Sequence, residues 1–123
     1  MSRKPYIMKS EEIQTLIAGL LSYGPEETYN KMRAKALFSI DQKDDIDEMF
    51  LDMSETLLKK GREELENETD ENPSLASIYY TLSSILRKLA HEIYIKYIKQ
   101  GKTRSSNRFI RLISYNKDAP LMI

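Results

Sequence analysis

The sequence predicts an all-α fold: a four-helix bundle with a long C-terminal helix and a short irregular or extended basic tail. Apolar residues recur every three or four positions over most of the chain, which is the period of one helical face. Glycine and proline are scarce, with four of each, and this disfavours a fold built from many tight turns. The length of 123 residues suits one domain. We therefore expect residues 1–123 to form a single helical domain.

The clearest periodic stretch predicts a helix over residues 73–100. Asn72 is a suitable N-cap, and Pro73 suits the first helical position, where no N–H is needed. Gly101 is a stop signal. At 1.5 Å per residue, a helix of this length spans on the order of 40 Å, so we expect the other helices to pack against it. Its apolar face comprises Leu75, Ile78, Tyr79, Leu82, Leu86, Leu89, Ile93 and Tyr97.

Three more helices are expected before it, after a basic leader. The leader occupies residues 1–9, and the helices are predicted over residues 10–23, 25–40 and 44–66. Gly24 followed by Pro25 separates the first two, because glycine favours a helix end and proline a helix start. Acidic residues crowd the end of the third helix, where they oppose the helix dipole. A loop is therefore expected from about Glu66 to Asn72, and the basic and apolar tail occupies residues 103–123.

Charge is segregated along the chain although the net charge is zero. Residues 41–72 carry thirteen acids against four bases, a net charge of −9, and residues 87–117 carry nine bases against one acid, a net charge of +8. The two segments can lie side by side and neutralise each other. Alternatively, the basic segment faces a polyanion or an acidic partner.

The helix over residues 73–100 has a second, partly apolar face in its C-terminal half. A helix that is apolar on two sides is usually covered on both. We expect the cover to be a protein partner, a second copy of the chain, or the tail at 103–123. The predicted partner interface comprises Tyr80, His91, Tyr94, Ile95 and Ile98.

The basic segment is also a candidate surface for a nucleic acid or an acidic partner, because lysine and arginine contact phosphates and aromatic rings stack on bases. Tyr94, Phe109 and Tyr115 are the candidate stacking residues. No recognised DNA- or RNA-binding motif accompanies them. The candidate cationic residues are Arg87, Lys88, Lys96, Lys99, Lys102, Arg104, Arg108 and Arg111.

The usual constellations of an enzyme are missing from the sequence. There is no cysteine nucleophile, His91 is the single histidine, and the four glycines form no phosphate loop. The acidic stretch before Asn72 lacks the glycine and the ligand spacing of a calcium loop. We therefore expect a protein that is not an enzyme, with no catalytic residue, cofactor or metal. One alternative stays open: Arg87 and His91, one helical turn apart, resemble the ribonuclease motif of HEPN-domain proteins.

Two segments resemble the GINS family of replication-fork subunits. The segment IYYTLSSILRKLAHEIYIKYIKQ, Ile78 to Gln100, is similar to the last helix of that family's helical domain. The segment FIRLISYNKDAPLMI, Phe109 to Ile123, resembles the opening strand of its second domain. The resemblance implies a non-catalytic subunit of a hetero- or homo-tetramer that binds helicase and primase partners.

These features predict a non-enzymatic helical subunit for protein interaction or assembly, in a GINS-like DNA replication complex. The alternative function is a small nucleic-acid-binding protein, of viral or ribonucleoprotein type, that uses the basic segment 87–117. The third is a ribonuclease that uses Arg87 and His91. No membrane partner is expected, because no apolar run approaches the roughly 20 residues of a membrane helix. The start of the chain has no apolar signal core, so an intracellular location is expected, cytoplasmic or associated with nucleoid or nucleus.

Overall fold

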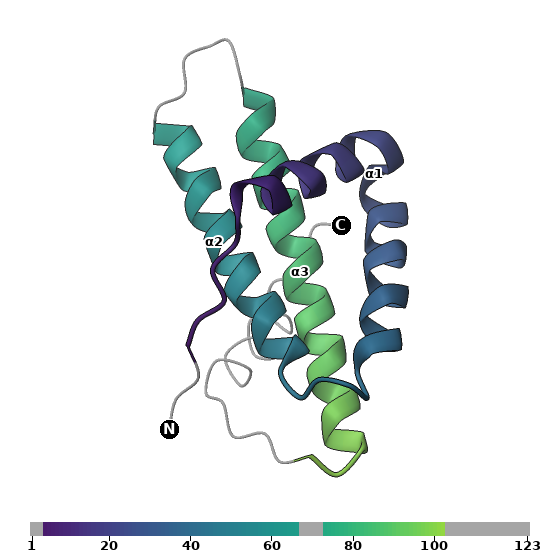
Figure 1. The fold of residues 1–123 in the computed structure, drawn as a ribbon. Helices are drawn as coiled ribbons and strands as arrows, with labels where there is room; N and C mark the ends of the chain where they lie inside the picture. The colour runs from purple at the N-terminus through teal and green to yellow at the C-terminus, as the bar shows by residue number, and fades with distance from the viewer. Residues whose placement is uncertain (1–3, 67–72, 103–123) are drawn as a thin grey trace, which may run out of the picture.

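The computed structural model describes residues 4–66 and 73–102, in which all regular secondary structure is helical (Figure 1). The helices are α1 (Ser10–Ser39), α2 (Ile46–Glu66) and α3 (Pro73–Lys99). Within these ranges there is no strand, and the predicted all-α class is confirmed. The tail predicted at residues 103–123 lies outside the described residues, and so do Arg104, Arg108 and Arg111.

The first helix is one element with a sharp kink at Gly24. This residue has φ 81° and ψ 168°, in a region of backbone space that glycine tolerates better than other residues. Pro25 follows and begins the second arm, where its missing N–H removes no helical hydrogen bond. The predicted division between residues 10–23 and 25–40 thus falls at the kink. The four-helix bundle is not confirmed, because the described residues form three helices, of which α1 has two arms.

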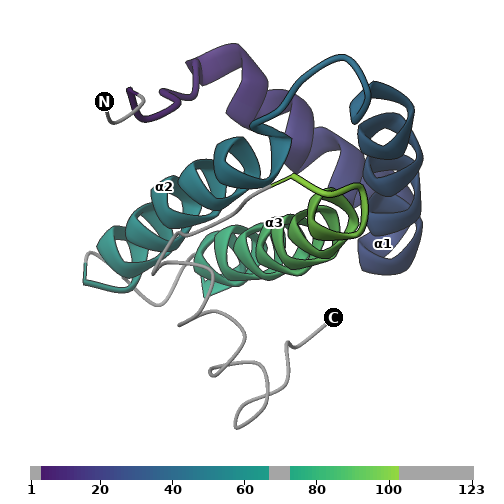
Figure 2. The same cartoon turned by 90° about the horizontal axis from the view of Figure 1, so that it is seen from below.

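The long helix α3 is central in the arrangement. Figures 1 and 2 show α2 running antiparallel beside it, and the second arm of α1 (residues 25–39) lying along its other side. The first arm of α1 (residues 10–23) crosses over the helices, as Figure 1 shows. Among the described helices, none combines the length and the apolar composition of a membrane-spanning segment.

The core is built mainly from α3. Its leucine and isoleucine stripe is fully buried, and Leu57 of α2 is buried against it. Two polar contacts add to this packing. The Ser83 hydroxyl of α3 donates to the backbone oxygen of Ser54 in α2 at 2.8 Å, and the Tyr97 hydroxyl of α3 donates to the backbone oxygen of Lys43 in the turn before α2. The buried α3 stripe comprises Leu82, Ile85, Leu86, Leu89, Ala90 and Ile93.

A close approach between α2 and α3 explains Gly61, which lies inside a helix at a cost of about 1 kcal/mol relative to alanine. A Cβ atom at this position would lie 3.3 Å from the Tyr80 ring and 3.4 Å from Tyr79. The absence of a side chain therefore lets the two tyrosines of α3 pack directly onto α2.

The segment before α1 is anchored by Tyr6 and Met8. The backbone N–H of Tyr6 donates to the Asp52 carboxylate at 2.9 Å, and its hydroxyl donates to the Glu12 carboxylate at 2.7 Å. Met8 is buried in the core. These contacts join the leader to both α1 and α2.

Candidate anion site between α1 and α3

The strongest candidate site is a groove of about 340 Å³ between the second arm of α1 and the C-terminal half of α3. Four of its side chains carry a permanent positive charge, and one carries a carboxylate. We call it the cationic groove. Its lining residues are Tyr29 and Arg33 from α1, and Lys88, His91, Glu92, Ile95, Lys96 and Lys99 from α3.

Helical spacing gathers these side chains on facing sides of the two helices. On α3, the lysines 88, 96 and 99 lie eight and three positions apart, so they project from one side. On α1, Tyr29 and Arg33 are four positions apart and are neighbours on the helix surface. Lys96 and Lys99 also lie in the last turn of α3, where the helix dipole favours positive charge.

Glu92 is engaged by α1 and joins the two walls of the groove. Its carboxylate accepts a hydrogen bond from the Tyr29 hydroxyl at 2.7 Å and another from Nε of Arg33. Burial, together with the hydrogen bond to Glu92, raises the pKa of Tyr29 to about 12, so its hydroxyl keeps its proton at neutral pH. Because Arg33 offsets the charge of Glu92, the three lysines determine the net positive charge of the groove.

The lysines of the groove differ in their surroundings. The Lys88 ammonium lies 4.7 Å from the centroid of the Tyr29 ring, a cation–π contact that covers this ring. Neither Lys96 nor Lys99 forms an ion pair within residues 4–66 and 73–102. Lys99 is exposed and Lys96 is half-buried, so both are placed to meet an anion from solvent.

His91 lines the same groove and is half-buried. Burial lowers its pKa below the ordinary value of 6.5, so the imidazole is mainly neutral at pH 7. Arg87, its partner in the ribonuclease hypothesis, is half-buried one turn away and is not among the residues that line the groove. Among the described residues, no group of three or more acidic, histidine or cysteine side chains is placed to hold a metal ion.

Only some of the residues of the predicted cationic surface lie together in the structure. Lys88, Lys96 and Lys99 line the groove, whereas Lys102 pairs with the Asp44 carboxylate and lies 4.9 Å from the Tyr97 ring centroid. That pair is a contact between the basic and acidic segments, as in the neutralisation alternative.

The five residues of the predicted partner interface do not form one open surface. Tyr94 is only 6% exposed and belongs to the core, and Tyr80 packs against Gly61. His91 and Ile95 are half-buried in the lining of the groove, while Ile98 is 44% exposed. The buried sector of α3 is wider than a single stripe because helices pack on two of its sides.

Sequence reasoning missed Tyr29 and Arg33. Tyr29 falls on the apolar stripe of its helix and was assigned to the core, and Arg33 lies beside that stripe, where basic residues are typical of solvated surface. No sequence pattern identifies the partner of Glu92, because Lys88 and Lys96 lie four positions away on its own predicted helix and could satisfy its charge. The sequence does not reveal that this partner is Arg33.

Comparison with known proteins gives no match, whether to a protein-family model, a curated protein or a solved structure.

Proposed function

We propose that this chain is a non-enzymatic helical module that binds the phosphate backbone of a nucleic acid in the cationic groove. The observation that carries the proposal is the charge of the groove, in which Arg33 and three lysines surround one carboxylate already engaged by α1. Lysine and arginine side chains are among the groups that proteins use to contact phosphates.

The length of the basic row suits an extended polyanion better than a single small anion. Lys88 and Lys99 are eleven residues apart on α3, which corresponds to roughly 16 Å along the helix axis. Successive phosphates of one DNA strand are spaced by about 3.4 Å along a duplex, so several phosphates fall within this distance. Binding should be independent of sequence, because Lys88 covers the Tyr29 ring that could otherwise stack on a base.

The proposal can be tested by fluorescence anisotropy with labelled single-stranded and double-stranded oligonucleotides at low salt. The Lys96→Glu/Lys99→Glu double variant should lower the affinity at least tenfold, since it replaces two phosphate contacts with repulsion. The matched control is Lys59→Glu/Arg62→Glu, which makes the same change in net charge on exposed positions of α2.

If the nucleic acid binds in the cationic groove, only the Lys96→Glu/Lys99→Glu variant should lose affinity. Equal losses in the two double variants would mean that binding follows net charge alone. Absence of binding by the unaltered chain at low salt would remove the proposal.

A second candidate function is assembly with a protein partner, and the exposure of Ile98 favours it. Ile98 lies seven positions after His91 and three after Ile95, so the three residues share one side of α3 beside the cationic groove. A GINS-like role in DNA replication combines both candidates, and its support is the resemblance of Ile78–Gln100 to the last helix of that family's helical domain. If Ile98 is at an interface, sedimentation should show an oligomer that Ile98→Glu dissociates. A monomer before and after the change would contradict assembly through this residue.

A further inference from the structure

A second concavity is lined by residues of both arms of α1 and of the start of α2, and its lining is mainly apolar. Its volume is about 440 Å³, within the usual range of small-molecule sites. Leu16 and Met32 line it from the two arms of α1, and Met49, Phe50 and Met53 line it from α2. We call it the methionine pocket.

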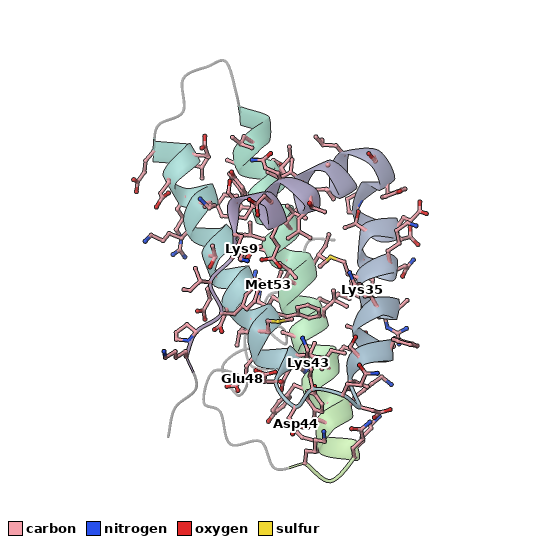
Figure 3. The ribbon with its side chains drawn as sticks, viewed as in Figure 1. Lys9, Lys35, Lys43, Asp44, Glu48 and Met53 are labelled. Atoms are coloured by element: carbon pink, nitrogen blue, oxygen red, sulfur yellow. The ribbon has the colours of Figure 1, made fainter. Side chains whose placement is uncertain are left out.

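The charged residues at this pocket leave positive charge available to a ligand. Lys35 and Lys43 both line it and are exposed, and neither forms an ion pair within the described ranges. Figure 3 labels Lys35 on the second arm of α1, Lys43 in the turn before α2, and Met53 on α2. The carboxylate of the pocket belongs to Glu12, which accepts hydrogen bonds from the Tyr6 hydroxyl at 2.9 and 2.7 Å.

We propose that the methionine pocket binds a small amphipathic anion, with its apolar chain against the methionines and its carboxylate at Lys35 and Lys43. Methionine side chains are unbranched and flexible, so three of them can adapt to a chain of variable shape. The two ammonium groups provide the matching charge for a carboxylate. This site is separate from the cationic groove, and its lining shares no residue with that groove.

Decanoate, below its micelle concentration, is a suitable probe, with decanol as an uncharged ligand of the same chain length. Isothermal titration calorimetry on the full chain should show one saturable site for decanoate. Lys35→Glu and Lys43→Glu should each weaken decanoate binding about tenfold and leave decanol binding unchanged, because only the carboxylate contacts these lysines. Thr15→Trp, at an exposed position in the pocket lining, should weaken the binding of both ligands.

Lys31→Glu is the matched control, since Lys31 lies on the same helix and outside the pocket, near Glu27 and Tyr23. It should bind decanoate with unchanged affinity, and circular dichroism should show that every variant remains helical. The proposal is overturned if decanoate shows no saturable binding, or if Lys31→Glu weakens it as much as Lys35→Glu does. It is overturned equally if Thr15→Trp leaves the binding of both ligands unchanged.

Discussion

Removal of the Glu92 carboxylate should weaken the fold and strengthen nucleic-acid binding at the same time. Glu92 accepts hydrogen bonds from Tyr29 and Arg33, and these bonds tie α3 to α1. It also provides the one carboxylate in the lining of the cationic groove, so Glu92→Ala adds one net positive charge there. Stability should fall while affinity for nucleic acid rises, whereas simple damage to the fold would lower both.

The expected magnitudes follow from the contacts. A hydrogen bond to a charged group contributes about 1.5–3 kcal/mol. The Arg33 and Glu92 side chains are 41% and 26% exposed, so solvent screens part of their interaction. We expect Glu92→Ala to lower the free energy of unfolding by about 2 kcal/mol, or the Tm by roughly 8 °C. The affinity for single-stranded DNA at low salt should rise roughly twofold to fivefold, because a unit charge several ångströms from a phosphate contributes about 0.5–1 kcal/mol in water.

Tyr29→Phe is the matched control, because it removes one hydrogen bond to Glu92, keeps the ring under Lys88 and changes no charge. It should lower the free energy of unfolding by about 1 kcal/mol and leave the DNA affinity unchanged. Urea unfolding followed by circular dichroism measures the first quantity, and fluorescence anisotropy measures the second. A folded Glu92→Ala variant with unchanged or lower DNA affinity would refute the reasoning.

Three further predictions concern other parts of the molecule. Tyr97→Phe removes the hydrogen bond to the backbone oxygen of Lys43 and should cost about 1–2 kcal/mol of stability in urea unfolding; an unchanged midpoint would contradict it. Hydrogen bonding to a carboxylate raises the pKa of Tyr6, and burial raises that of Tyr29, each to about 12. Because the pKa values of both tyrosines in the folded state lie above the ordinary value of 10, their protonated hydroxyls stabilise the fold fully below pH 10. The free energy of unfolding should therefore fall between pH 10 and 12, and the fall should be smaller when both tyrosines are replaced with phenylalanine. If the chain has ribonuclease activity at His91, His91→Ala should abolish it in an RNA cleavage assay, and surviving cleavage would exclude that residue.

The helices could be predicted from the sequence because each has a clear apolar period and clear end signals. The start of α3 at Pro73 and the break at Gly24 were expected from the residues themselves, and α3 ends one residue before the predicted position. The number of elements was not predictable in the same way. Whether a glycine followed by a proline separates two helices or kinks one depends on the direction in which the chain continues, and tertiary packing determines that direction.

The candidate site was predictable on one helix only. The lysines of α3 were identified by their charge, but the opposite wall of the groove comes from α1, more than fifty residues earlier. Tyr94 shows the complementary error. Its position on the helical wheel indicated a second, partly apolar face that a partner, a second copy or the tail would cover, and the structure buries Tyr94 in the core instead. Periodicity along one helix does not reveal how many neighbours that helix has.

The most direct test of the cationic groove is the salt dependence of single-stranded DNA binding by the unaltered chain and by Lys96→Ala. Each phosphate contact contributes about 0.7 to the slope of the logarithm of affinity against the logarithm of salt concentration on single strands. We predict a steep slope for the unaltered chain and a slope smaller by about 0.7 for Lys96→Ala, with Lys59→Ala unchanged. Identical slopes for all three proteins would contradict binding in the groove.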